Sequence, residues 1–249
     1  MMRFYNRNQI ELFTTIAAST GAGVANVYDR NAATVWTSVG SNDATTETIE
    51  VVWAAARTIS AISLLTHNFK QFTVQYWNGS AYVDFSTPIN ETVNAEANNL
   101  FTFTAVSTLK VKISAVTTIV ANAQKYIGEF LAYNEYFSLA PGNLWDTENN
   151  VPYYKQNEHE KADGGSVVVV EAMKPKYQNV FTFNDLLETY VDYITNLKNL
   201  HLSFWLMPDD SKPEKQYYVN MIQPQFDKVS VWGPAGEQCY RGSFNVKET

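Results

Sequence analysis

Short runs of alternating apolar and polar residues occupy the chain from about residue 45 to residue 133. Within residues 48–53, Ile49, Val51 and Trp53 fall on one face at the two-residue period of a β-strand. Similar runs follow at residues 58–65, 72–77, 82–85, 101–103, 109–113 and 127–133. Because no convincing helical pattern separates these runs, they predict a β-sandwich or jelly roll. The Asn78-Gly79 pair between two of the runs predicts a two-residue hairpin turn.

The second half of the chain has a different rhythm. Turn-forming residues with few apolar anchors dominate residues 139–165, which we interpret as a connecting loop. Beyond it, apolar residues at helical spacing predict a helix from Leu186 to Leu200, capped at its start by Asp185. Strand-like runs surround this helix. The predicted fold is therefore mainly β: a sandwich over residues 1–138, the loop, and a β-rich α+β domain over residues 166–249 with one helix against a sheet.

Composition narrows the classes of function. Aromatic residues make up 14% of the chain and charged residues only 17%, against a typical charged fraction of about 25%. Large interfaces between subunits are likewise rich in aromatic residues and poor in charged residues. The net charge of −7, with no basic block, argues against nucleic-acid binding. No run approaches the roughly 18 apolar residues of a membrane span, and the first residues lack the apolar core of a secretory signal, so we predict neither membrane insertion nor export by a signal peptide.

Motifs for catalysis are scarce. His159-Glu160 is followed by Asp163 where a zinc protease has its second histidine, and no nucleophile elbow or complete phosphate loop is present. The single cysteine, Cys239, excludes an internal disulfide and has no sequence neighbour that would activate its thiol. We therefore predict that the protein is not an enzyme and requires no cofactor. A hydrolase that uses a pair of carboxylates is the remaining catalytic alternative.

The first half of the chain resembles a discoidin-type module of the coagulation factor C-type, galactose-binding-like family. The first matching segment reads Asp-Arg-Asn-Ala-Ala-Thr-Val-Trp-Thr-Ser, similar to the family pattern Asp-x-x-x-x-Thr-x-Trp-x-Ser. The resemblance covers about residues 15–135. Arg30 departs from it, because the family usually has glycine there, and the terminal cysteine pair of extracellular animal members is absent. The matching segments are residues 29–38, 58–62, 72–79 and 127–130.

This resemblance implies a glycan site. In modules of the family that bind glycans, the ligand lies in loops at one end of the sandwich, where an aromatic ring stacks on the sugar and amides, histidine or arginine bind its hydroxyl groups. The ligand-binding candidates in this sequence are His67, Asn68, Lys70 and Trp77. The alternative is structural: His67 and Asn68 cap a strand, and Trp77 flanks the hairpin turn.

The resemblance also implies a structural calcium ion. Asp29, Thr34 and Glu129 match the positions that hold it in many such modules. Calcium needs six or more oxygen ligands, so loop carbonyls would supply the rest. Because Arg30 replaces glycine, a salt bridge or a turn capped by Asp29 is the alternative.

A further resemblance is to discoidin-like tail proteins of bacteriophages. It rests on an Asn-x-Tyr-Asp-Arg segment at residues 26–30, a strand ending in His-Asn at residues 67–68, and a last strand ending in Phe-Asn-Val-Lys-Glu at residues 244–248. It implies a structural component of a virion, in the tail or baseplate, made in the host cytoplasm. Its partners would be other virion subunits and copies of itself, in a threefold or sixfold ring, joined through the C-terminal domain. The alternative is a stand-alone carbohydrate-binding module that recognises a cell-surface glycan.

Overall fold

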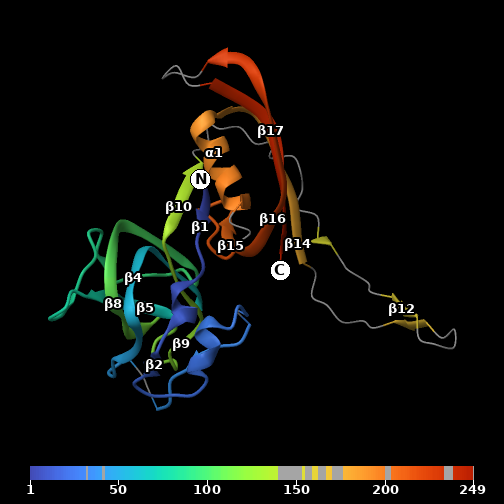
Figure 1. Ribbon diagram of the computed structural model, residues 1–249. Helices are drawn as coiled ribbons and strands as arrows, with labels where there is room; N and C mark the ends of the chain where they lie inside the picture. The colour runs from blue at the N-terminus through green and yellow to red at the C-terminus, as the bar shows by residue number, and fades with distance from the viewer. Residues whose placement is uncertain are drawn as a thin grey trace. The chain divides into compact units, whose positions relative to one another are not determined.

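The computed structural model describes residues 1–31, 33–40, 43–139, 153–154, 159–161, 167–169, 176–199, 203–232 and 238–248, which form two compact units (Figure 1). The sandwich unit comprises residues 5–136 and 209–215, and the α+β unit comprises residues 1–4, 137–208 and 216–249. The α+β unit thus includes the first four residues, which the prediction assigned to the sandwich. Most of the predicted connecting loop lies outside the described residues.

Two long strands organise the sandwich unit. They are β4 (Glu47–His67) and β8 (Asn99–Thr118), which pair antiparallel over most of their length. Each joins two of the runs that the sequence pattern predicts as separate strands. Their register shifts between Val52 and Arg57 and again between Ile59 and Ala61. Because bulges bend a strand, the two halves of β4 can belong to different layers.

The two layers share β4 and β8. One layer contains the first half of β4 and the second half of β8, flanked by β2 (Thr15–Ala18), β5 (Phe69–Trp77), β6 (Tyr82–Val83) and β7 (Ile89–Glu91). The other contains the second half of β4 and the start of β8, flanked by β9 (Tyr126–Tyr133) and β3 (Trp36–Thr37). Two short 3-10 helices contact β9, namely η1 (Gln9–Leu12) and η2 (Val24–Tyr28).

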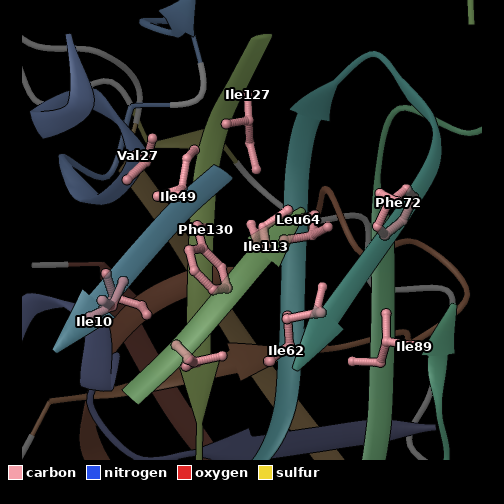
Figure 2. Packing of buried hydrophobic residues seen from close by; sticks show 14 of the residues in the cluster. Ile10, Val27, Ile49, Ile62, Leu64, Phe72, Ile89, Ile113, Ile127 and Phe130 are labelled. Carbon is pink, nitrogen blue, oxygen red and sulfur yellow. The ribbon is translucent and has the colours of Figure 1, made fainter. Parts of the chain in front are cut away.

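The core of the sandwich unit lies between these layers. Figure 2 shows Leu64, Ile113 and Phe130 pointing toward one another from β4, β8 and β9. Trp53 is buried at one side of the core, and its indole Nε1 donates a hydrogen bond to the carbonyl of Gln9 over 2.7 Å. The alternation that predicts strands therefore also identifies the side chains that fill the core.

The α+β unit contains a seven-stranded sheet in the order β10-β1-β15-β16-β17-β14-β11. Phe244 lies at the centre of its core, with the rings of Phe4, Phe181 and Phe183 within 6 Å of its centroid. A separate pair is formed by β12 (His159–Lys161) and β13 (Val167–Val169). The strands of the sheet are β1 (Met2–Tyr5), β10 (Glu135–Leu139), β11 (Tyr153–Tyr154), β14 (Lys176–Leu187), β15 (Phe204–Met207), β16 (Tyr217–Trp232) and β17 (Gln238–Glu248).

Helix α1 (Glu188–Asn199) packs against this sheet through Ile194 and Leu197 (Figure 1). The prediction placed the start of the helix at Leu186, which is wrong by two residues. Leu187 pairs with Cys239 in the ladder between β14 and β17, so its backbone is committed to the sheet. The predicted end at Leu200 lies outside the described residues.

The structure confirms the predicted mainly-β class, with a sandwich followed by a sheet that carries the single α-helix of the described residues. The hairpin predicted at Asn78-Gly79 is present between β5 and β6, but its two turn residues lie one position later, since the backbone N–H of Asn78 donates to the carbonyl of Ala81 over 3.0 Å. The regular pairing of the two strands ends at Trp77 and Tyr82. Asn78 organises the turn, because its side-chain oxygen accepts hydrogen bonds from the backbone N–H groups of Ser80 and Ala81.

Candidate functional site

His67 lies at the end of β4 and is fully buried. Its Nε2 donates to the side-chain oxygen of Asn99 over 2.6 Å, and its Nδ1 accepts from the backbone N–H of Phe69 over 3.1 Å. Burial disfavours the charged imidazolium and lowers the pKa of His67 to about 4, although the bond to Asn99 acts in the opposite direction. His67 is therefore a neutral side chain with both ring nitrogens engaged inside the protein.

Asn68 is also engaged internally. Its Nδ2 donates to the carbonyl of Gln124 over 2.7 Å, and its Oδ1 accepts from the backbone N–H of Tyr126 over 2.9 Å. These bonds tie the start of β5 to the loop before β9. The alternative of a structural role therefore describes the observed contacts of both His67 and Asn68.

The other two glycan candidates lie at opposite ends of β5. Lys70 is exposed near the beginning of the strand, and Trp77 is its last residue. At about 3.3 Å of rise per residue, their Cα atoms are on the order of 20 Å apart along the strand. The structure thus brings together His67, Asn68 and Lys70, but it does not place Trp77 with them.

The end of the sandwich at which β4 and β8 finish and β5 and β9 begin, hereafter the loop end, exposes apolar side chains. Val39, Val93 and Val120 are 66%, 76% and 71% exposed. Their loops are joined by backbone hydrogen bonds: Ser38 to Lys125, Asn94 to Lys70 and Ile119 to Asn68. Ile119 and Tyr126 are also exposed, and both are bonded to Asn68 at this end of the sandwich. A group of exposed apolar residues on neighbouring loops is typical of an interaction surface.

Trp77 belongs instead to the outward face of the layer formed by β4, β8, β5 and β6. Strand alternation places Val51, Val74 and Val111 in the core, so the residues between them point outward. Register pairs Glu50 with Lys112, Lys112 with Gln75, and Trp77 with Tyr82. We call this surface the Trp77 face and define it by Glu50, Gln75, Trp77, Tyr82, Lys110 and Lys112.

The side chains of the Trp77 face hold one another in position. The rings of Trp77 and Tyr82 meet edge to face, with centroids 5.4 Å apart. Lys110 Nζ lies 4.9 Å from the Trp77 ring centroid, and Lys112 Nζ lies 4.0 Å from that of Tyr82. All four side chains are partly exposed. The result is an ordered aromatic surface with two ammonium groups, reachable from solvent.

Tyr82 is fixed by a hydrogen bond from its phenol to a carboxylate oxygen of Glu50. Burial, the hydrogen bond to Glu50 and the negative charge of Glu50 together raise the pKa of the Tyr82 phenol above its ordinary value. The phenol therefore stays protonated and remains a donor at any physiological pH.

Asp29, Thr34 and Glu129 do come together, as the resemblance implies. Thr34 Oγ1 donates to Asp29 Oδ2 over 2.6 Å. The backbone N–H of Asn31 is shared by the two carboxylates, at 2.9 Å from Asp29 Oδ1 and 2.6 Å from Glu129 Oε1. The three predicted residues thus surround one turn, which Asp29 caps.

One oxygen of the Glu129 carboxylate is available to bind a cation. This oxygen, Oε2, is buried and has no hydrogen-bond donor. Burial, with contributions from the Asp29 and Glu11 carboxylates, raises the pKa of Glu129 to about 8, while the N–H of Asn31 acts in the opposite direction. Two carboxylates and a hydroxyl are the hard oxygen ligands that calcium prefers, so the residues present fit a calcium ion.

Arg30, which replaces the glycine of the family pattern, adopts the backbone conformation that glycine favours. Its φ is 61°, in the left-handed region where glycine is favoured. Its guanidinium forms a bidentate pair with Glu11, with distances of 2.9 Å from Nε to Oε1 and 2.7 Å from Nη2 to Oε2. The predicted alternative of a salt bridge is therefore present beside the turn.

Within the described part of the chain, no group of three or more His, Cys, Asp or Glu side chains is placed to hold a metal ion. Cys239 is buried as a free thiol. No helix among the described residues is long and apolar enough to cross a membrane. His159, Glu160 and Lys161 lie in β12, while Asp163 lies outside the described residues.

No protein-family model matches the chain, and no curated protein matches it significantly. Several solved carbohydrate-binding modules are similar to about half of the chain. Chitosan-binding module 2 of a Paenibacillus sp. IK-5 chitosanase/glucanase, solved with chitotriose, is 24% identical over 50% of this chain and 99% of that one, with a TM-score of 0.42. The family 32 module of Clostridium perfringens NanJ, solved with galactose, is 18% identical over 54% of this chain and 100% of that one, also at 0.42.

The sequence pattern did not identify most of the Trp77 face. Trp77 is among the glycan-binding candidates of the sequence, whereas Tyr82, Lys110 and Lys112 are not. The available signal was the alternation itself, since Lys110 and Lys112 both occupy polar positions between core residues of one run. Their neighbours across the sheet depend on register, which alternation alone does not specify.

Proposed function

We propose that the sandwich unit is a non-catalytic carbohydrate-binding module and that the Trp77 face is its contact surface. The observation that carries the proposal is the partly exposed indole of Trp77, held edge-on by Tyr82 and flanked by the ammonium group of Lys110. Binding sites for small polar ligands combine an apolar or aromatic surface with a few positioned polar groups.

The physical basis is that a pyranose ring has an apolar face of C–H groups and an edge of hydroxyl groups. An aromatic ring can bury the apolar face at little cost in conformational entropy, because its own position is already set by packing. Gln75, Glu50 and the two lysines lie within the same face and can hydrogen-bond hydroxyl groups.

The test uses the full 249-residue chain on an array of neutral and acidic oligosaccharides, followed by calorimetry on those that bind. Trp77→Ala should weaken binding at least tenfold, which corresponds to about 1.4 kcal/mol. Tyr126→Ala, at the loop end, is the matched control because Tyr126 is also a partly exposed aromatic residue. Binding lost in Tyr126→Ala but kept in Trp77→Ala would move the site to the loop end. The absence of any glycan binding would overturn the function.

We also propose that Asp29, Thr34 and Glu129 would hold a structural calcium ion. The support is the buried Glu129 oxygen without a donor, beside a second carboxylate. When bound, the ion would supply positive charge to both carboxylates and tie β9 to the turn after η2. It has no catalytic role in this proposal. A calcium-dependent rise in melting temperature tests it.

A second candidate function is favoured by the apolar side chains at the loop end. We propose that Val39, Val93 and Val120 contact another protein subunit, as a virion assembly component would require. Light scattering and cross-linking of the full chain test this role. Substitution of the three valines by serine should abolish any oligomer without changing the melting temperature. A monomer at all concentrations, absent from purified virus particles, would contradict it.

A further inference from the structure

We propose that the Trp77 face recognises an acidic glycan, whose carboxylate is bound between Lys110 and Lys112 while its pyranose ring contacts the part of the Trp77 indole that Lys110 leaves exposed. This inference rests on the proposed carbohydrate-binding function and specifies the class of ligand. The observation behind it is the placement of the two ammonium groups over aromatic rings, with no carboxylate of the described residues within 4.0 Å of either.

The two lysines are neighbours on the outward side of β8. They are two residues apart on one strand, so their Cα atoms are separated by about 7 Å. Lys110 Nζ lies over Trp77 and Lys112 Nζ lies over Tyr82. Each ammonium group therefore lies over one of two rings that contact each other on a single surface.

The lysines have no anionic partner in the described residues. Salt bridges of 4.0 Å or less occur there at Arg7, Arg30 and Lys212, and neither Lys110 nor Lys112 joins one. Each ammonium group contacts the negative face of a ring, which is a weak attraction for an exposed cation. Their capacity for charge-assisted hydrogen bonds remains available to a ligand.

Two carboxylates of the same layer accept hydrogen bonds from neutral donors instead of forming ion pairs with these lysines. Glu50 lies directly across the strand pair from Lys112, yet it accepts the hydrogen bond of the Tyr82 phenol. Asp84 accepts a hydrogen bond from Gln75 Nε2 over 3.0 Å. Both acids are thus held on neutral donors, and an incoming carboxylate would be the first to pair with the ammonium groups.

The net charge of the chain is opposite in sign to that of the two lysines, which makes binding of an acidic ligand selective for this surface. The chain carries a net charge of −7, so an acidic polymer is repelled at long range. Binding of such a polymer would therefore require specific contacts at short range. A uronic acid supplies both parts of the contact, because it joins a carboxylate directly to a pyranose ring.

The experiment compares trigalacturonate with its fully methyl-esterified form by calorimetry on the full chain. The two probes share the same rings and differ in charge. We expect the acid to bind at least tenfold more tightly, and we expect this difference to shrink as salt is raised from 50 to 500 mM. The double variant Lys110→Met/Lys112→Met, which keeps most of each apolar side chain, should lose the preference. Lys215→Met, at an exposed lysine outside the Trp77 face, should keep it.

The outcomes separate the two proposals. Equal binding of both forms, lost in Trp77→Ala, would overturn the acidic preference and leave the carbohydrate-binding function standing. Binding of the acid that persists in the double lysine variant would also overturn the preference. If neither form binds and the glycan array is negative, the carbohydrate-binding function itself fails. If a sulfated oligosaccharide binds with the same lysine dependence, the recognised group is a general anion on a sugar.

Discussion

The phenol of Tyr82 donates a hydrogen bond to Glu50 although two strands, β5 and β8, lie between their own strands in the sheet. The Tyr82 ring therefore lies across the outward face, with the Lys112 ammonium group above it. The hydrogen bond to Glu50 thus fixes the Tyr82 ring, against which Trp77 packs. It also orients the Glu50 carboxylate toward the phenol, and Glu50 forms no ion pair of 4.0 Å or less with Lys112, which is the condition for the proposed recognition of an acidic sugar.

Removal of the Tyr82 hydroxyl group should lower the stability of the fold slightly and weaken ligand binding at the Trp77 face. Tyr82→Phe leaves the Glu50 carboxylate without this donor on a partly exposed surface, so the free energy of unfolding should fall by about 1 kcal/mol. Urea unfolding measures the change, with Tyr126→Phe as the control. We also expect weaker binding of trigalacturonate, because Glu50 becomes free to pair with Lys112. Equal stability of the two variants would show that the bond contributes nothing.

Acid should destabilise the sandwich unit through His67. Its pKa of about 4 in the folded protein lies below the ordinary 6.5, so the unfolded chain takes up a proton that the folded chain does not. The contribution of His67 to the free energy of unfolding is therefore complete above pH 6.5. It is lost as the pH falls toward 4, at about 1.4 kcal/mol per pH unit. The total loss is roughly 3 kcal/mol.

Comparison with His67→Gln isolates this effect. The raised pKa of Glu129 acts in the opposite sense, since that group stabilises the folded state most at low pH and less as the pH rises toward 8. Both proteins share the Glu129 contribution. Urea unfolding at several values between pH 4 and 7 should show a steeper acid loss in the wild type. Parallel curves would exclude His67 as the cause.

Calcium at 1 mM should raise the melting temperature at pH 7.5, because an ion that binds only the folded state stabilises it by mass action. Glu129→Gln should remove this response, since the amide has lost the charge that the ion would pair with. Glu96→Gln, at an exposed loop residue, is the matched control and should respond as the wild type does. A melting temperature that calcium does not change would show that the turn is complete without an ion.

Gly242 should tolerate no side chain in the α+β unit. A Cβ at this position would lie 1.9 Å from the carbonyl oxygen of Gln225 and 2.7 Å from the Cα of Phe226. Because both atoms belong to the backbone of β16, Gly242→Ala must displace the strand, at a cost of about 3 kcal/mol. Hydrogen exchange should accelerate along β16 and β17. Ser243→Ala, one residue further, should leave exchange unchanged, and equal effects of the two changes would refute the steric explanation.

Parts of the candidate sites could be predicted from the sequence, and others could not. Asp29, Thr34 and Glu129 were selected by a family pattern as calcium ligands, and the structure places them around the backbone N–H of Asn31, while the ion itself stays a prediction. His67 and Trp77 were selected by residue type and position near strand ends. The pattern could not show that one of them is buried with both nitrogens engaged while the other faces solvent at the far end of β5.

The sequence by itself determined the mainly-β class and most of the strand positions, because alternation of apolar side chains is a local record of which face is buried. Tertiary structure decided where strands join, where α1 begins and which outward residues meet. Leu187 is committed to the sheet only because Cys239 pairs with it from about fifty residues away. The contact between Tyr82 and Glu50 likewise depends on the register of three strand pairs. Such pairings are set by long-range packing, which no window of neighbouring residues records.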